Sequence, residues 1–246
     1  MKFYLGMHLP YLAKNFERSF ISVNVLRKRK SDFEVKDWIM DSGAFTEIST
    51  YGEYRTGVLE YANLIERWRT CGNLELAVAQ DYMCEPFILA KTGLTVERHQ
   101  ELTIERYVAL IHMTPHPILP VLQGYKPSEY VRHVKMYGHL LDYGMRVGVG
   151  SVCKRNSKPS EIVAVLEAIK QERPDLKLHG FGLKLTALKN NYIQSLLYSA
   201  DSMAWSYSAR KQGRNPNGLQ EAHNFVEHIA ATGGTKPHQF VLVDSK

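Results

Sequence analysis

Cysteine is scarce in this sequence, and its few copies are far apart. Cys71, Cys84 and Cys153 are the three cysteines among 246 residues, and no two of them form a Cys-x-x-Cys pair. An odd number of widely spaced cysteines indicates neither a disulfide framework nor a zinc knuckle. A reducing cytoplasm is the simplest setting for such a chain.

Long apolar runs are also missing. The run within residues 1–8 is too short for a secretory signal, and no stretch approaches the roughly 18 apolar residues that a membrane span requires. The sequence has no internal repeat, no low-complexity linker and no glycine-rich dinucleotide fingerprint after its first apolar run. We therefore expect a single domain without a membrane partner.

Acidic residues are fewer than basic ones. The chain has 31 Lys and Arg against 25 Asp and Glu, which gives a formal net charge of +6. A basic excess is compatible with a polyanionic partner such as nucleic acid but does not establish one. Hydrophobic residues make up 44% and charged residues 23%, which is typical of a globular protein with a sizeable core.

Apolar runs alternate with helical patterns along the chain. The strand-like runs cover residues 2–6, 20–26, 38–41, 74–80, 118–122, 146–149, 176–179 and 202–206. Helical periodicity covers residues 11–18, 57–70, 161–170, 187–198 and 218–231, and begins again at 95 and at 127. Alternation of this kind predicts a parallel sheet with crossover helices, and eight units predict a (β/α)₈ TIM barrel.

The barrel is expected to form one domain over residues 1–232. An open, doubly wound sheet is the rival arrangement. Residues 233–246 are expected to form a C-terminal appendage, in which 240–243 could add an edge strand.

Polar residues gather where the predicted strands end. Asp41 closes the third run, in Ile39-Met40-Asp41-Ser42-Gly43-Ala44-Phe45-Thr46. Further acids, amides and glycines follow or begin other runs: Asp81, Gln123, Gly124, Gly148, Gly150, Ser151, His179, Gly180, Gly182 and Asp201. Each alone is more typical of a helix cap or a turn. Because the carboxyl ends of barrel strands form one face, together they predict a ligand pocket.

Basic residues follow the same strands. They are Arg27, Lys28, Arg29, Lys30, Lys154, Arg155, Lys184, Arg210, Lys211 and Arg214. Such loops would form a positive rim suited to a phosphate backbone, although a run of charges is usually only a solvated face. Nearby aromatic residues could stack on a base: Tyr82, Tyr125, Trp205 and Tyr207.

Short motifs along the barrel resemble those of the tRNA-guanine transglycosylases. Asp41-Ser42-Gly43-Ala44-Phe45-Thr46 is similar to that family's Asp-Ser-Gly-Gly-Phe-Gln motif. Gln80-Asp81 matches the position of its base-recognising Asp, and Asp201-Ser202 that of its nucleophile. The glycine-rich loops are matched by Leu122-Gln123-Gly124, Gly148-Val149-Gly150 and Gly180-Phe181-Gly182.

The chain departs from that family in ways that point to a subgroup. The family's zinc site of three cysteines and a histidine has no counterpart, and residues 203–207 differ from its Val-x-Pro-Thr-Arg run. The sequence is most similar to the zinc-less relatives that insert 7-deazaguanines into DNA in phages and bacterial modification islands. The setting implied is the cytoplasm of a bacterium or of a phage-infected host cell.

The resemblance implies a base-exchange reaction with no cofactor and no metal. Asp201 would be the nucleophile and Asp41 the acid and base, following the two-carboxylate logic of retaining glycosidases. The base would be bound by Ser42, Gly43, Phe45, Asp81, Gln123, Gly124, Gly148, Gly150, Ser151, His179, Gly180 and Gly182. The expected partners are nucleic acid, DNA in preference to tRNA, and a base such as 7-cyano-7-deazaguanine. A homodimer or a helper protein stays open.

Other functions remain open at this point. They are a tRNA-guanine transglycosylase of the queuosine or archaeosine type and a barrel glycoside hydrolase that pairs Asp41 with Asp81 or Asp201. They also include a Schiff-base lyase that uses Lys184, and a binding subunit without catalysis.

Overall fold

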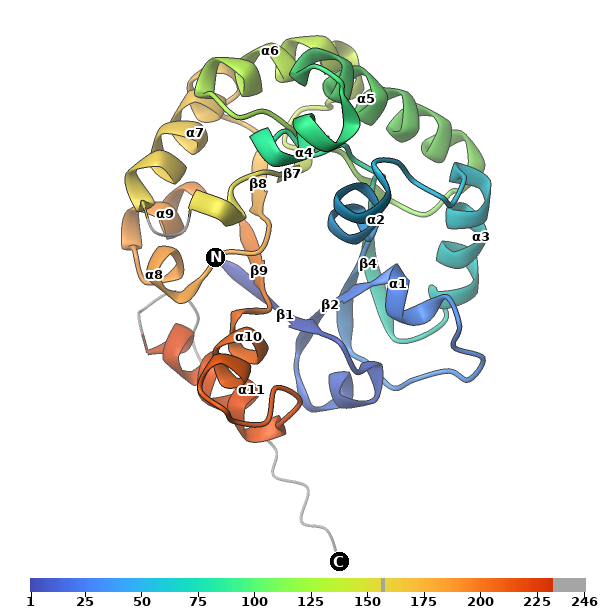
Figure 1. The fold of residues 1–246 in the computed structure, drawn as a ribbon, viewed down its shortest axis with the longest axis vertical. Helices are drawn as coiled ribbons and strands as arrows, with labels where there is room; N and C mark the ends of the chain where they lie inside the picture. The colour runs from blue at the N-terminus through green and yellow to red at the C-terminus, as the bar shows by residue number, and fades with distance from the viewer. Residues whose placement is uncertain (156–157, 232–246) are drawn as a thin grey trace, which may run out of the picture.

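Parallel strands surrounded by helices form a barrel in the computed structural model, which describes residues 1–155 and 158–231 (Figure 1). The strands are β1 Lys2–Met7, β2 Arg18–Ser22, β3 Asp37–Asp41, β4 Asn73–Val78, β5 Ile118–Leu119, β6 Val121–Leu122, β7 Arg146–Val149, β8 Lys177–Gly180 and β9 Ser199–Ser202. Their order in the sheet is β5-β4-β3-β2-β1-β9-β8-β7-β6, and every pairing is parallel.

The helices surround the strands, with α2 and α4 inside the ring that the longer helices form in this view (Figure 1). They are α1 Val23–Leu26, α2 Ala44–Tyr51, α3 Val58–Trp68, α4 Pro86–Thr92, α5 Val96–Met113, α6 Pro127–Tyr137, α7 Pro159–Glu172, α8 Leu185–Leu188, α9 Asn191–Leu196, α10 Ala204–Lys211 and α11 Leu219–Ala230, with short 3₁₀ turns at Pro10–Asn15, Gly138–Leu140 and Cys153–Arg155. Three of them begin at a proline, where the missing N–H costs no hydrogen bond and the fixed φ suits a helix.

Pro120 explains why nine strands make an eight-unit barrel. It separates β5, which pairs with β4, from β6, which pairs with β7. Proline has no N–H for the ladder, but its carbonyl accepts a hydrogen bond from Gly148 N at 2.8 Å. The predicted strand over 118–122 is therefore one strand interrupted by proline, and it joins the two ends of the sheet. The predicted (β/α)₈ fold is confirmed.

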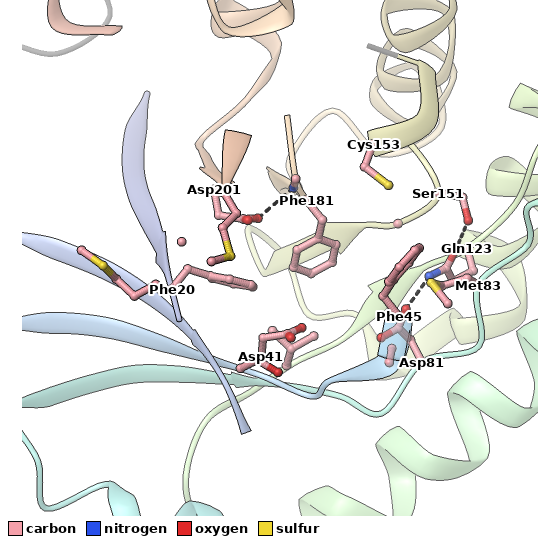
Figure 2. A pocket seen from close by; sticks show the side chains of 18 of the residues that line it. Phe20, Asp41, Phe45, Asp81, Met83, Gln123, Ser151, Cys153, Phe181 and Asp201 are labelled. Atoms are coloured by element: carbon pink, nitrogen blue, oxygen red, sulfur yellow. Dashed lines mark hydrogen bonds between the residues drawn. The ribbon is translucent and has the colours of Figure 1, made fainter. Parts of the chain in front are cut away.

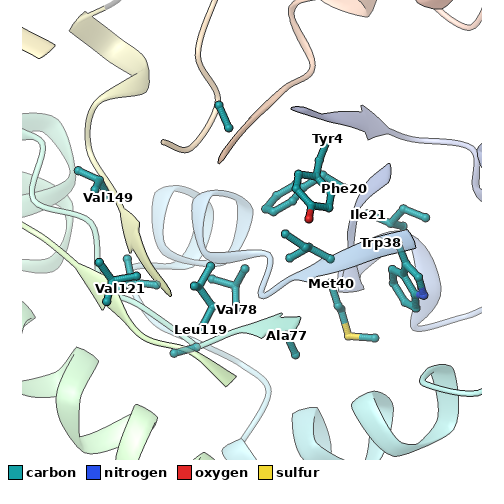
Figure 3. Packing of buried hydrophobic residues seen from close by; sticks show 14 of the residues in the cluster. Tyr4, Phe20, Ile21, Trp38, Met40, Ala77, Val78, Leu119, Val121 and Val149 are labelled. Atoms are coloured by element: carbon teal, nitrogen blue, oxygen red, sulfur yellow. The ribbon is translucent and has the colours of Figure 1, made fainter. Parts of the chain in front are cut away.

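Strand side chains alternate between the barrel axis and the helix layer. Tyr4 and Phe20 lie inside the barrel, whereas Trp38 and Met40 lie on the opposite side of the strands (Figure 3). All four are buried, and they belong to one continuous hydrophobic core. Because β3 alternates in this way, Asp41, which follows Met40, faces the axis at the carboxyl end.

Two predicted strands are wrong in part. The second ends at Ser22, and Val23–Leu26 is helical because the Ser22 hydroxyl accepts a hydrogen bond from Asn24 N and starts a turn. The last strand is Ser199–Ser202 rather than 202–206, since α10 begins at Ala204, whose N–H is bound by the Ser202 hydroxyl. Asp201 therefore lies within the strand rather than before it.

Two further short helices, α2 and α4, were not predicted, and the predicted helix over 11–18 is the 3₁₀ turn Pro10–Asn15. The predicted helix over 187–198 is two short helices, α8 and α9, joined at Asn190, whose side chain caps the second. The predicted appendage over 233–246, including 240–243, lies outside the described residues. Within residues 1–155 and 158–231, no helix has both the length and the apolar character required to cross a membrane.

Candidate active site

The carboxyl ends of the strands surround a cavity of about 370 Å³. Asp41, Asp81 and Asp201 line it together with Gln123 and Ser151 (Figure 2). The predicted gathering of polar strand ends is therefore present for these five residues.

Asp41 is the last residue of β3 and lies beside Ser22, the last residue of β2. Its Oδ2 accepts a hydrogen bond from Gly43 N at 3.2 Å. Gly43 has a φ of 76°, in the left-handed region that favours glycine. Burial, followed by the negative charge of Asp201, raises the pKa of Asp41 to about 6. This carboxyl can therefore hold a proton near neutral pH.

Asp201 lies across the cavity on β9. Its Oδ1 lies 3.1 Å from Gly182 N, which donates to it, and 3.3 Å from His179 Nε2. Burial raises the pKa of Asp201 to about 7, although the hydrogen bond from Gly182 opposes that shift. Asp41 and Asp201 can thus both exchange protons in the neutral range.

Asp81 is held by a chain of polar side chains. Its Oδ2 accepts a hydrogen bond from Gln123 Nε2, and its Oδ1 accepts one from Ser42 Oγ at 3.4 Å. The other end of the Gln123 amide, Oε1, accepts from Ser151 Oγ at 2.8 Å. Burial raises the pKa of Asp81 to about 7. An acid beside an oriented amide can bind the donors and acceptors of a planar base edge.

Ser151 has a strained backbone. Its φ is 55°, and it is the sole non-glycine with positive φ among the described residues. Its Oγ accepts a hydrogen bond from Cys84 N at 3.0 Å and lies 2.9 Å from Glu85 Oε2. Backbone strain of this kind persists where the surrounding contacts over-determine a residue, and it concentrates at functional sites.

Aromatic rings form the apolar walls of the cavity. Phe20, Phe45 and Phe181 line it, and the Phe45 side chain is 47% exposed (Figure 2). Gly148 leaves room for Phe181, because an added Cβ would lie 2.4 Å from that ring. Polar groups on opposite sides and rings between them suit a flat heteroaromatic ligand (Figure 2).

Several predicted base-binding residues lie behind the cavity rather than on its wall. His179 is fully buried beneath Asp201. Gly124 packs against Tyr130, and Gly180 packs against Leu183. Gly150 and Gly182, which were also predicted to bind the base, do line the cavity.

The predicted basic rim is only partly exposed. Lys28, Lys30, Lys184, Arg210, Lys211 and Arg214 are exposed, and Arg27 and Arg29 are partly buried. Arg214 pairs with Glu221 at 2.6 Å. Lys154 belongs to the 3₁₀ turn Cys153–Arg155.

Arg155 differs from the rest of that rim because it is buried. Its guanidinium binds the Tyr125 carbonyl and stacks on the Tyr125 ring at 4.5 Å. This contact leaves the Tyr125 side chain 39% exposed. Of the other aromatic candidates, Tyr207 is exposed, whereas Tyr82 and Trp205 are buried.

Sequence reasoning missed part of the cavity wall. The missed residues include Phe20, Ser22, Met83, Glu85, Phe181 and Met203. Phe20 and Ser22 carry the period-2 signal of an inward strand face, which could have identified them. Glu85 gave no comparable signal, since it lies in the loop after Asp81.

Metal ligands are not grouped in the described part of the chain. Across residues 1–155 and 158–231, no three His, Cys, Asp or Glu side chains are placed to hold a metal ion.

Comparison with models of protein families matches residues 1–226 to the family described as DeoxyPurine in DNA protein A, or DpdA. A search of curated proteins finds no match.

Proposed function

The chain belongs to the DpdA family, DeoxyPurine in DNA protein A, and from this membership we propose that it replaces guanine in DNA with a 7-deazaguanine base. The observation that carries the proposal is the pair Asp41 and Asp201, two buried acids on one cavity whose pKa values are both raised. We propose 7-cyano-7-deazaguanine or a derivative as the incoming base.

The first half of the reaction removes guanine. An Asp201 carboxylate oxygen attacks C1′ of the deoxyribose, and the bond from C1′ to guanine N9 breaks with its electron pair going to the base. The Asp41 carboxyl donates its proton to the departing guanine. The product is a sugar esterified to Asp201, with Asp41 left as a carboxylate.

The second half returns a base to the sugar. The Asp41 carboxylate takes the proton from N9 of the incoming 7-deazaguanine, and that nitrogen attacks C1′. The ester bond to Asp201 breaks, which restores its carboxylate. Asp41 thus regains from the incoming base the proton that it gave to guanine, and no other proton donor is needed.

Base recognition falls to the polar chain of Asp81, Gln123 and Ser151. The amide of Gln123 and the carboxyl of Asp81 face the cavity and match the donors and acceptors on the edge of a guanine-like base. A duplex hides the C1′–N9 bond, so the nucleotide must be flipped into the cavity. Exposed Lys28, Lys30, Lys184, Arg210 and Lys211 would hold flanking phosphates.

Trapping the sugar ester tests the proposal. Wild-type protein is incubated with a guanine-containing DNA duplex, denatured, and analysed for a covalent adduct by gel and mass spectrometry. Asp201→Asn should abolish the adduct, because an amide does not attack C1′, whereas Asp41→Asn should slow its formation by roughly 10²–10⁴-fold.

Several outcomes contradict the proposal. An adduct on Asp201→Asn would assign the nucleophile elsewhere, and no adduct with DNA but one with tRNA would favour the tRNA reaction. Hydrolysis of simple glycosides without salt-sensitive DNA binding would favour a glycoside hydrolase.

A further inference from the structure

A chain of polar side chains runs through the barrel interior to Asp201. It begins at Glu75 on β4 and continues through Arg146 on β7, Ser199 on β9 and His179 on β8. None of its members is used by the reaction proposed above. Buried polar side chains destabilise a core unless each has a hydrogen-bond partner. A chain of four such residues therefore suggests a role beyond packing.

Arg146 is the centre of the chain. Its Nη1 donates to Glu75 Oε2 at 3.2 Å and to the Tyr4 hydroxyl at 3.3 Å, while Tyr4 itself donates to Glu75 at 2.8 Å. The Arg146 side chain is only 11% exposed. Glu75, which also lies 3.9 Å from Lys2 Nζ, therefore fixes the guanidinium from the side away from Asp201.

The remaining nitrogens of Arg146 set the direction of the next hydrogen bonds. Nε donates to Ser199 Oγ at 3.1 Å, so the Ser199 hydroxyl proton is left to donate to His179 Nδ1 at 2.8 Å. Arg146 Nη2 is 3.5 Å from the same Nδ1, and arginine can only donate. His179 Nδ1 is therefore an acceptor.

A neutral imidazole that accepts at Nδ1 carries its proton on Nε2. Burial, followed by the positive charge of Arg146, holds the pKa of His179 well below its usual range, so the ring is neutral. Nε2–H then donates to Asp201 Oδ1 across 3.3 Å. The rings of Tyr4, Phe20 and Phe181 enclose the imidazole, with Glu75 and Arg146 on the side opposite Asp201.

The two donors that reach Asp201 from other residues meet the same oxygen. His179 Nε2 and Gly182 N both bind Oδ1. An oxygen that accepts two hydrogen bonds has its charge stabilised there and is the poorer nucleophile. Oδ2 is the oxygen left for bond formation.

We propose that Arg146 and Ser199 are positioning residues that fix His179 as an Nε2–H donor and thereby select Oδ2 of Asp201 as the atom that bonds to C1′. The role of Oδ2 rests on the proposed function, whereas the state of His179 does not. A purely structural network would preserve the fold but would leave the His179 tautomer and the rate of ester formation unaffected by Ser199.

The test compares two buried strand serines. Ser199→Ala removes the hydroxyl that sets the tautomer, and Ser19→Ala removes a fully buried hydroxyl that has no hydrogen-bond partner in the described structure. Long-range ¹H–¹⁵N NMR of ¹⁵N-histidine-labelled full-length protein reports which His179 nitrogen carries the proton. We expect Nε2–H in wild type and Ser19→Ala, and a measurable Nδ1–H population in Ser199→Ala, where the longer 3.5 Å contact from Arg146 Nη2 is the donor that remains at Nδ1.

Single-turnover formation of the Asp201 ester is measured on the same proteins across pH 5–9. With the tautomer changed, Ser199→Ala loses the hydrogen bond from His179 Nε2 to the Asp201 carboxylate, which corresponds to about a tenfold slower step. Its rising pH limb should move upward by about one unit, because an Nε2 lone pair facing Oδ1 disfavours the carboxylate. DNA affinity should stay at the wild-type value.

A second pair addresses His179 itself. His179→Gln keeps an amide N–H near the Nε2 position, whereas His179→Asn places its amide near Nδ1, so ester formation should be retained better by the glutamine variant. Equal rates in these two, or an unchanged tautomer in Ser199→Ala, would overturn the proposal. If wild type shows the expected tautomer but forms no ester, the proposed function fails and the Nε2–H assignment stands.

Discussion

At the residue scale, the site depends on space as much as on functional groups. Gln123 lies directly over Gly150, where an added Cβ would be 2.1 Å from Gln123 Nε2. The same amide bonds to Asp81 and Ser151 at its two ends. Any side chain at position 150 must therefore displace the residue that we propose reads the base.

Gly150→Ala should impair base binding more than folding. Displacing Gln123 loses its hydrogen bonds to Asp81 and to the base, which corresponds to roughly a tenfold or greater rise in KM for the incoming base. The measurement is steady-state exchange of labelled base into DNA. Gly57→Ala is the control, since an added Cβ there meets nothing within 4 Å. An unchanged KM in Gly150→Ala would mean that Gln123 does not bind the base.

Residue identity alone also misdirected part of the sequence reading. Arg155 follows a strand end, as a rim cation should, yet it is buried against Tyr125. His179 was predicted to bind the base, yet it is buried behind the cavity and contacts Asp201. Sequence shows that a polar residue ends a strand, but the rotamer that sends it into or behind the cavity depends on neighbours from other strands.

At the element scale, α10 connects the first strand of the barrel to the last. The Trp205 indole on α10 donates to the Gly6 carbonyl at 2.9 Å, and Gly6 lies in β1 close to the Ser202 carbonyl of β9. Trp205 is buried. The helix after the last strand therefore fastens the last strand to the first.

Trp205→Phe should destabilise the protein through this hydrogen bond. The Gly6 carbonyl would lose a buried partner, which costs about 1–3 kcal/mol beyond the packing lost with the indole. Thermal unfolding by calorimetry measures the effect. Trp68→Phe is the matched control, because the Trp68 indole is fully buried and its N–H has no partner within the described structure. Equal losses in Tm for the two variants would contradict the role of the Trp205 hydrogen bond.

Most elements of the barrel follow from sequence periodicity, and the exceptions have local causes. Strands β1, β3, β4, β7 and β8 have bounds close to those predicted from their apolar runs. The last strand was misplaced because residues 203–206 are as apolar as a strand, while the deciding contact is the Ser202 hydroxyl on Ala204 N. Such a side-chain cap competes with strand extension and leaves no periodic signal.

At the scale of the whole molecule, the buried acids of the site reduce the free energy of unfolding when they are ionised. Burial raises the pKa of Asp41 to about 6, and of Asp81 and Asp201 to about 7, from an ordinary value of 3.8. The folded protein then binds protons that the unfolded chain has released. Stability therefore falls as the pH rises from about 4 through these raised pKa values, and the cost is complete above them.

Asp201→Asn should be more stable than wild type at pH 8 and equal to it at pH 4. At pH 8 the wild type carries a buried charge that the amide lacks, a difference of the order of a few kcal/mol and roughly 5 °C in Tm. The opposite sign is expected for Asp175→Asn, because the hydrogen bond from Arg173 holds the pKa of Asp175 below its usual range. The Tm difference between Asp201→Asn and wild type is compared at the two pH values. If the variant gains less Tm over wild type at pH 8 than at pH 4, the burial argument is contradicted.

The hydrogen bonds of Gln123 have a consequence for ligand binding at this site. Asp81 and Ser151 each form a hydrogen bond to one end of the Gln123 amide. The polar atoms that a base would bind therefore already have partners within the protein. An arriving base must compete with these contacts and gains only the difference. A ligand whose edge does not match breaks the hydrogen bonds of Gln123 without replacing them. These internal hydrogen bonds therefore lower the affinity for every base but increase the selectivity for the matching one.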